Sequence, residues 1–542
     1  MLSQRKFIAV FITILILFSY NSLISQVANF RIHPSANAQV EPTIVKHPSN
    51  PMIMFTGAYT ISGAFRSEGV YITTDGGQNW FGSDTCNSGA STNNHGGDPG
   101  PVIDKDGRFI LTHQGGFITG MFSNISTDFG STWSGNFQIA SGDQDKGTPG
   151  TDDFAASPYY GRTYLMWTRF LNPFPIVSAF TTNGGVSWSA INQINSTPGG
   201  FISLGADIKT NVDGSVCVCW AGALTSSPQN EKFCGFAKSI NGGINWSVNE
   251  NIFDMNGVKT SSLMPWNIRI NGYPHIEIDK TGGPRNGNIY IVTGEKNLLP
   301  AGTDPDIIFH RSSDGGATWS SAVKVNQDPV NNGKVQYFPA IAVDDDGGIN
   351  IIYYDNRNVT SDSMDVFLSR STDGGTSWRD YRINEKRFKP KSVTGAVGSG
   401  NQGDNIGMLF GNNRLRPVWM DDHTGVYQIW SASIDLTTLG IKQISTEVPD
   451  NFSLKQNYPN PFNPTTKIRF DITRDARRET QEVSIIVYDA LGKPIQTILN
   501  ETLSPGSYEF EFNAGNLPSG MYFYTLEADG QKIDSKKMVL VK

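Results

Sequence analysis

The sequence predicts an all-β protein: a β-propeller, with seven blades favoured and six as the alternative, followed by a small C-terminal Ig-like β-sandwich. The 542 residues include 57 Gly, 31 Phe, 18 Tyr and 11 Trp but only 17% charged residues, a composition that favours strands and turns over surface helices. One octapeptide pattern recurs six times, which is typical of a repeat fold. From Val448 onward, strand-like segments alternate with Gly, Pro and Asn turns, as expected of a small antiparallel sandwich.

The N-terminus is typical of a secretion signal. Arg5 and Lys6 precede the apolar run FIAVFITILILFSY, and a polar stretch begins at Asn21. Because the run is shorter than the ~20 residues that span a bilayer, we predict a signal peptide over residues 1–28, with an N-terminal membrane anchor as the alternative. No transmembrane helix is expected in the mature chain.

The octapeptide has the form [S/T]-x-[D/N]-x-G-x-x-W, and its chemistry is that of a tight turn. Asp or Asn accepts backbone N–H groups, Gly supplies a positive φ, and Trp packs the turn onto its neighbour. We therefore expect the acidic and amide side chains of the pattern to be structural. They are Asp75, Asp128, Asn183, Asn241, Asp314 and Asp373.

This pattern resembles the Asp-box, the bacterial neuraminidase repeat of sialidases and other propellers, where it joins the third and fourth strands of a blade. The resemblance implies a sialidase-like Asp-box propeller over residues 29–446. A short entry segment and then an apolar strand precede each of the six boxes, and a further pair follows the last box. That seventh pair is the reason for favouring seven blades. Residues 29–38 could add an edge strand to the last blade and close the ring.

The C-terminal segment has a motif order of its own. NYPNPFNPTT, YDALGK, LPSGMYFY and KKMVLVK follow one another within residues 447–542. This order resembles the type A C-terminal sorting domain of the bacterial type IX secretion system. The resemblance implies the type IX machinery as a partner, export through the periplasm, and a secreted or outer cell-surface location. A carbohydrate-binding or adhesive sandwich is the alternative.

Charge and cysteines exclude two further classes. A net charge of −7 offers no basic stripe for a phosphate backbone, so no nucleic-acid partner is expected. Cys217 and Cys219 face one side of a predicted strand and Cys234 lies on the next, which leaves either a cross-strand disulfide from Cys234 or free buried thiols. Together with Cys86, they lack the paired CxxC spacing of a zinc site, and no metal ligand is assigned.

The candidate site follows from the geometry of a propeller. The start of the first strand and the end of the second strand of each blade share one mouth of the ring, whereas the box turns lie at the other. This expectation places acidic entry residues around one mouth, interrupted by Tyr273 and Phe338. The predicted catalytic residues are Glu41, Asp145 and Asp404, and the predicted ligand-binding residues are Asp98, Arg169, Asp207, Tyr273, Tyr353, Asp355, Arg357 and His423.

Converging carboxyl groups allow three interpretations. A protonated acid beside an ionised partner could cleave a glycosidic bond, or hard oxygen ligands could hold Ca²⁺. The third interpretation is a repeated structural device, in which each carboxylate caps the N–H groups at the head of its strand. Calcium is the one cofactor that this pattern would accommodate, and none is identified by a motif.

The resemblance to sialidases implies a specific set of active-site residues. It implies three arginines that grip a carboxylate, a Tyr and Glu nucleophilic pair, and an Asp acid. Arg31-Ile32 resembles the family's RIP motif, but His33 stands in place of Pro, and only Arg169 and Arg357 are further candidates. We therefore expect a propeller that binds an extracellular glycan or protein ligand, with a glycoside hydrolase, exo-sialidase-like or other, as the alternative. Whether the protein is an enzyme stays open.

Overall fold

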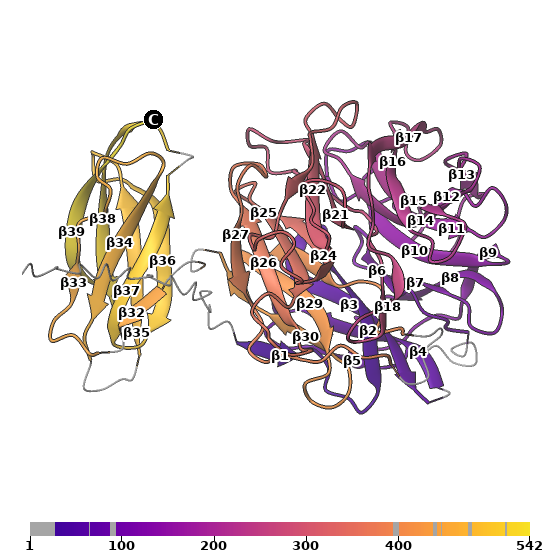
Figure 1. The fold of residues 1–542 in the computed structure, drawn as a ribbon, viewed down its shortest axis with the longest axis horizontal. Helices are drawn as coiled ribbons and strands as arrows, with labels where there is room; N and C mark the ends of the chain where they lie inside the picture. The colour runs from indigo at the N-terminus through magenta and orange to yellow at the C-terminus, as the bar shows by residue number, and fades with distance from the viewer. Residues whose placement is uncertain are drawn as a thin grey trace, which may run out of the picture.

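The structure is a computed structural model that describes residues 28–63, 65–86, 94–393, 400–436, 439, 442–445, 447–474, 480–514 and 517–542. Figure 1 shows a larger body of several sheets around a centre and a smaller two-sheet body at the C-terminal end. Within the described residues every element is a strand, which confirms the all-β prediction. No helix in this part of the chain is long and apolar enough to cross a membrane. The predicted signal peptide, apart from its last residue, lies outside the described residues.

Apart from one two-stranded hairpin, seven antiparallel sheets follow one another between Asn29 and Asp435, and in the first six the strand order is the chain order. The first three are β2 (Ala38–His47), β3 (Asn50–Ser62), β4 (Phe65–Thr73), β5 (Phe81–Ser83); β6 (Gly100–Ile103), β7 (Phe109–Gln114), β8 (Gly120–Ser126), β9 (Phe137–Ser141); and β10 (Gln144–Thr151), β11 (Thr163–Arg169), β12 (Ile176–Thr181), β13 (Asn192–Gln193). The next three are β14 (Phe201–Thr210), β15 (Val216–Leu224), β16 (Glu231–Ser239), β17 (Ser247–Asp254); β20 (His275–Ile278), β21 (Ile289–Glu295), β22 (Asp306–Ser312), β23 (Val323–Lys324); and β24 (Gln336–Val343), β25 (Ile349–Asp355), β26 (Asp365–Ser371), β27 (Arg379–Arg382).

The seventh sheet closes the ring. It consists of β28 (Gly407–Gly411), β29 (Arg414–Asp421), β30 (Gln428–Ala432) and the N-terminal β1 (Asn29–Arg31), with the short β31 (Ile434–Asp435) beside β29. The predicted edge strand is therefore present, because β1 pairs antiparallel with β30. The first strands of successive sheets contact one another from β2 through β28 and back to β2. The outer strands β5, β9, β13, β17 and β27 lie at the periphery in Figure 1.

The recurring octapeptides form hydrogen-bonded turns between the third and fourth strands. Asp75 Oδ1 accepts from the backbone N–H groups of Gln78 and Asn79, both at 2.9 Å, and these bonds lower the pKa of Asp75 to about 2. The corresponding backbone bond recurs at the other five turns. The turns also join neighbouring sheets: Trp319 packs edge-on against Phe236 of the preceding sheet. The Asp and Asn side chains of the octapeptides are thus already engaged in hydrogen bonds that stabilise the turns.

A repeated bulge shapes the inner strands near one mouth. The pairing register shifts within β2, β10, β14 and β24, where Glu41, Lys146, Gly205 and Phe338 have φ values of 57°, 50°, 64° and 53°. Asp98, just before β6, has φ 54°. This left-handed conformation costs a non-glycine residue about 1 kcal/mol or more. Its recurrence indicates a common device that turns the chain into the mouth.

The cysteines and the C-terminal body settle two further expectations. All four cysteines are free and buried, so the free-thiol alternative is the one observed.

The C-terminal body stacks two sheets with strand orders β32-β37-β34-β33 and β36-β35-β38-β39 around one hydrophobic core. These strands are β32 (Lys442–Ser445), β33 (Ser453–Leu454), β34 (Thr465–Ile472), β35 (Gln481–Tyr488), β36 (Pro494–Leu503), β37 (Gly506–Asn513), β38 (Gly520–Ala528) and β39 (Gln531–Leu540).

One strand of the sandwich lies before the boundary predicted at residue 447. β32 precedes it and pairs with β37 of the sandwich. The four residues of β32 contain one apolar side chain, Ile444. The sequence therefore shows no alternation of apolar and polar residues that would indicate a strand here.

Candidate functional site

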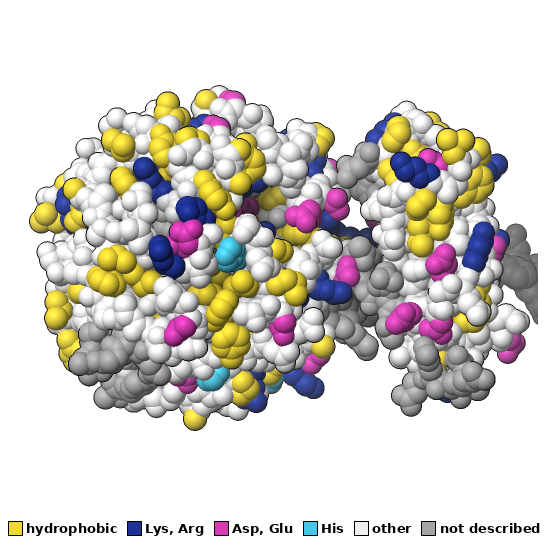
Figure 2. All heavy atoms as spheres, turned by 180° about the vertical axis from the view of Figure 1, so that it is seen from behind, with side chains coloured by type: hydrophobic (Ala, Val, Ile, Leu, Met, Phe, Trp, Pro, Cys, Tyr) yellow, Lys and Arg dark blue, Asp and Glu magenta, His cyan; other side chains and the backbone are white. Residues whose placement is uncertain are grey.

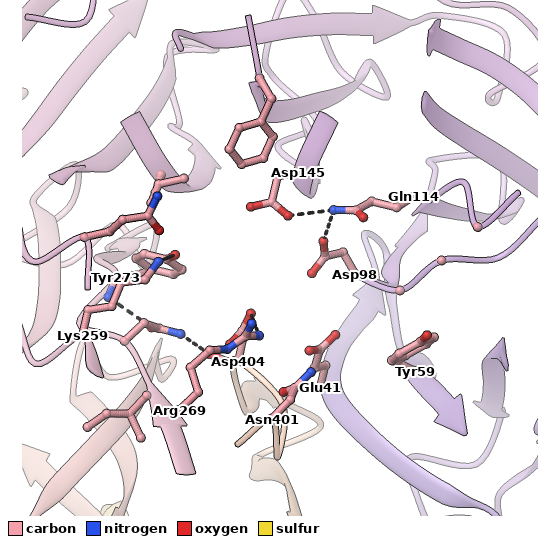
Figure 3. Close-up of a pocket in the computed structure, with 18 of the residues that line it drawn as sticks. Glu41, Tyr59, Asp98, Gln114, Asp145, Lys259, Arg269, Tyr273, Asn401 and Asp404 are labelled. Atoms are coloured by element: carbon pink, nitrogen blue, oxygen red, sulfur yellow. Dashed lines mark hydrogen bonds and ion pairs between the residues drawn. The ribbon is translucent and has the colours of Figure 1, made fainter. Parts of the chain in front are cut away.

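A cavity of about 880 Å³ opens at the mouth toward which the inner-strand bulges turn. Four carboxyl groups line it, those of Glu41, Asp98, Asp145 and Asp404. Figure 3 shows these side chains pointing into one central space, with Tyr273, Lys259 and Arg269 on the opposite wall from Asp98. The predicted catalytic residues and two of the predicted ligand-binding residues therefore lie together.

One amide group holds two of the acids. Gln114 Nε2 donates to Oδ2 of Asp98 at 2.5 Å and to Oδ1 of Asp145 at 2.8 Å, and the backbone N–H of Lys146 also donates to Asp98. Burial and then the charge of Asp145 raise the pKa of Asp98 to about 7. Burial and the charge of Asp404 likewise raise the pKa of Asp145.

The other two acids have opposite environments. Glu41 is 5% exposed, and burial, with the charges of Asp98 and Asp404, raises its pKa to about 8. Arg269 Nη2 donates to both carboxyl oxygens of Asp404, at 2.9 and 3.0 Å. Burial alone would raise the pKa of Asp404, but Arg269 and the nearby lysines outweigh it and lower that pKa. A protonated and an ionised carboxyl group thus share one cavity at neutral pH.

Lys259 and Arg269, the cationic residues on one wall of the cavity, belong to an insertion between the fourth and fifth sheets. A two-stranded hairpin, β18 (Thr260–Leu263) and β19 (Ile268–Ile270), carries Arg269 and is preceded by Lys259. Lys259 Nζ donates to the hydroxyl of Tyr273 at 2.6 Å. Burial lowers the pKa of Lys259 and raises that of Tyr273 well above its usual value.

A buried glutamate forms hydrogen bonds with both ends of this insertion. Glu231 accepts from the backbone N–H of Gly272 at 2.8 Å and from that of Lys259 at 3.1 Å. Its side chain is fully buried, and burial raises its pKa. Because both bonds go to the backbone, Glu231 sets the positions of Lys259 and Tyr273 without facing the cavity itself.

Sequence reasoning missed Gln114, Lys259, Arg269 and Arg66, all of which line the cavity. Gln114 ends β7, where the mouth was expected, but a lone glutamine carries no motif. The hairpin left no distinctive signal, because the chain between the fourth box and the fifth entry segment is about as long as that between the sixth box and the seventh entry segment.

Asp207 does not join the other acids. It lies two residues beyond Gly205, the bulge residue of its strand, and lines a second, smaller cavity. Its carboxylate accepts from the backbone N–H of Ile276 at 3.0 Å and lies 3.4 Å from Nδ1 of His275. An aspartate at the start of an inner strand can therefore be assigned to the cavity only when the position of the bulge is known.

Tyr353, Asp355 and Arg357 form a buried cluster in the sixth sheet and do not line the cavity. Arg357 donates to Asp355 at 2.7 Å and to the Tyr353 hydroxyl at 3.0 Å, and it also pairs with Asp380. The guanidinium is therefore occupied by structural partners.

The remaining candidates also lie away from the cavity. Arg169 donates to Gln193, His423 pairs with Asp421, and Phe338 is buried. Arg31 lies on the outer strand β1, over the ring of Trp430. The arginines at the mouth are Arg66 and Arg269 instead, so the partial RIP motif does not mark the site.

No metal site stands out in the described part of the chain. Within it, no group of three or more His, Cys, Asp or Glu side chains could hold a metal ion. Gln114 and Arg269 already engage three of the four cavity carboxylates. Calcium binding stays a prediction from the sequence. On the face shown in Figure 2, basic side chains are scattered rather than gathered into a stripe.

Residues 456–541 match the family of the secretion system C-terminal sorting domain. The protein therefore carries a type IX sorting domain and is secreted or attached to the cell surface. Its presence implies interaction with the secretion machinery. Among curated proteins, none matches this chain in sequence.

Several solved structures resemble the chain. An ulvan lyase of polysaccharide lyase family 25 is 11% identical, with a TM-score of 0.49 and coverage of 74% of this chain and 94% of that one. A protein of unknown function from Dyadobacter fermentans is 10% identical, with a TM-score of 0.44 and coverage of 75% and 97%. The Hadza microbial sialidase Hz136 is 13% identical, with a TM-score of 0.39 and coverage of 72% and 75%. At these TM-scores the similarity transfers no activity to this chain.

Proposed function

We propose that the cavity at the mouth of the ring binds a segment of an extracellular glycan. The observation that carries this proposal is the convergence of acceptors and donors on one space: four carboxyl groups, the Gln114 amide, Lys259, Arg269 and Tyr273. A saccharide presents many hydroxyl groups, each of which donates and accepts. The volume of about 880 Å³ suits a small-molecule ligand, and secretion of the protein places it among such ligands.

Glycoside hydrolysis is the second candidate, and the contrast between Glu41 and Asp404 favours it. A buried acid with a raised pKa could protonate the glycosidic oxygen, while an ionised carboxylate stabilises the developing positive charge or activates the nucleophile. Glu41 meets the first requirement and Asp404 the second. Asp145 is the alternative partner, since it lies in the same cavity and is oriented by Gln114.

The test uses the full mature chain on an array of oligosaccharide ladders. Each ladder contains one to six residues of β-1,3-glucan, β-1,4-glucan, β-1,4-mannan, β-1,4-xylan or α-1,4-galacturonan, and sialyllactose is added. Binding to any ladder that Glu41→Gln or Asp404→Asn weakens at least tenfold supports the proposal. Asp106→Asn, an exposed acid in the turn after β6, is the matched control and leaves binding unchanged.

Release of new reducing ends separates the two candidates. Turnover by the wild type that Glu41→Gln abolishes identifies a hydrolase, whereas binding without turnover identifies a binding protein. Absence of binding to every ladder overturns the proposal and directs the search to protein ligands.

A further inference from the structure

Four large apolar side chains are exposed beside the mouth, on loops of two neighbouring sheets. Phe117 and Ile118 lie between β7 and β8 and are 85% and 62% exposed; Phe170 and Leu171 follow β11 and are 39% and 62% exposed. Both phenylalanines line the cavity that holds the carboxyl groups. We call these four residues the apolar rim.

The first loop of the apolar rim is held by one buried side chain. Asn94 is 8% exposed, and its Oδ1 accepts from the backbone N–H groups of Phe117 and Ile118 at 2.9 and 2.7 Å. Its Nδ2 donates back to the carbonyl of Ile118 at 3.2 Å. A Cβ on Gly115 would lie 1.9 Å from the same carbonyl oxygen, so only glycine allows this tight turn.

The second loop is also fixed by its own contacts. The backbone N–H of Phe170 donates to the carbonyl of Asp143 at 3.0 Å, and that of Phe174 donates to the carbonyl of Leu171 at 2.7 Å. The rings of Phe170 and Phe174 meet edge to face, with centroids 6.4 Å apart. Both pairs of apolar side chains are therefore presented by ordered backbone rather than by loosely held loops.

An exposed phenylalanine held in place beside a polar cavity has a physical explanation. Exposed apolar surface is unfavourable in water, and a group of such side chains next to a pocket marks a binding surface. Ordering the loops in advance lowers the entropy lost on binding. The C–H faces of a sugar ring are apolar and flat enough to cover a phenyl ring, while its hydroxyl groups point sideways toward polar partners.

We propose that the apolar rim is a second subsite, which stacks against the sugar rings that follow along the chain from the ring bound in the cavity. The inference rests on the proposed function and deepens it: the ligand is a glycan chain of several residues that leaves the mouth across the second and third sheets. The cavity recognises hydroxyl groups, and the apolar rim recognises chain length.

The test measures affinity against ladder length with the same oligosaccharide array, on the full mature chain. Wild-type affinity is expected to rise at least tenfold from one to four residues. The double variant Phe117→Ala/Phe170→Ala is expected to lose that rise, so that its affinity no longer increases from one to four residues whatever its affinity for the shortest member. Ile240→Ala, which removes a 78% exposed side chain in a box turn, is the matched control and retains the length dependence.

Two results overturn this inference while leaving the proposed function standing. One is a wild-type affinity that does not depend on length, and the other is a double variant that keeps the full dependence. Absence of binding at every length is a different outcome, because it overturns the proposed function as well. Circular dichroism of the double variant checks that its strands are intact.

Discussion

Replacing Glu41 by glutamine is expected to change how the stability of the ring depends on pH. Glu41 keeps its proton to a pKa of about 8 in the folded chain, against an ordinary value of 4.5. The unfolded chain therefore binds fewer protons between these two pH values, and the free energy of unfolding falls as pH rises through that window. The full difference is on the order of 5 kcal/mol. A glutamine side chain has no proton to lose in this range, so the Glu41→Gln variant lacks this contribution.

The assay is urea unfolding at several pH values from 4 to 9, followed by tryptophan fluorescence. All 11 tryptophans lie between Trp80 and Trp430, so the signal reports on the ring alone. Relative to the wild type, Glu41→Gln is expected to gain at least about 2 kcal/mol between pH 4 and pH 9, and Asp106→Asn to gain nothing. Parallel pH dependences for the wild type and Glu41→Gln would refute the reasoning.

Three further outcomes follow from the site. Glu231→Ala leaves two buried N–H groups without acceptors, at about 1–3 kcal/mol each, and releases Lys259; glycan affinity should fall about tenfold by calorimetry. Glu277→Gln, whose side chain pairs with Lys209 at a different cavity, should have no effect. Arg357→Met uncovers buried carboxylates and should cost about 3–5 kcal/mol of stability in urea, with unchanged glycan affinity, so that a loss of affinity would place the cluster in the site. If the wild type hydrolyses a glycan, its rate should fall as pH rises through about 8, where Glu41 loses its proton; a rate that keeps rising above pH 9 would exclude Glu41 as the acid.

The fold was largely predictable because it repeats. Six boxes share one turn chemistry, and the structure places a sheet of four or more strands at each of the seven entry segments. The edge strand at Asn29–Arg31 was predictable because the last sheet of a closed ring needs an outer strand, and the N-terminal segment can supply it. β32 was not predictable, since four residues with one apolar side chain show no alternation.

Three of the four cavity acids were predictable because the bulge register agreed with the sequence pattern. Glu41 and Asp98 occupy the left-handed position itself, and Asp145 lies one residue before it, beside Lys146. Asp404 precedes β28, whose pairing with β29 shows no register shift. Asp207 comes two residues after the left-handed position and misses the cavity. Lys259 and Arg269 could not be predicted because they arrive on an insertion that belongs to no repeat.

Arg357 shows the opposite failure. Its position at the end of a second strand suggested a ligand-binding role, but a sequence does not reveal which neighbouring carboxylates will neutralise a cation. The structure surrounds it with Asp355, Asp380 and Asp328. A candidate cation is therefore informative only after its structural partners are known.

A crystal structure of the mature protein soaked with the strongest-binding ladder member tests the glycan site most directly. We predict a sugar ring in the cavity, with hydroxyl groups bonded to Glu41, Asp404 and Gln114, and the next ring stacked on Phe117 or Phe170. A glycan bound elsewhere on the ring or on the sandwich, with the cavity carboxyl groups untouched, would contradict this prediction.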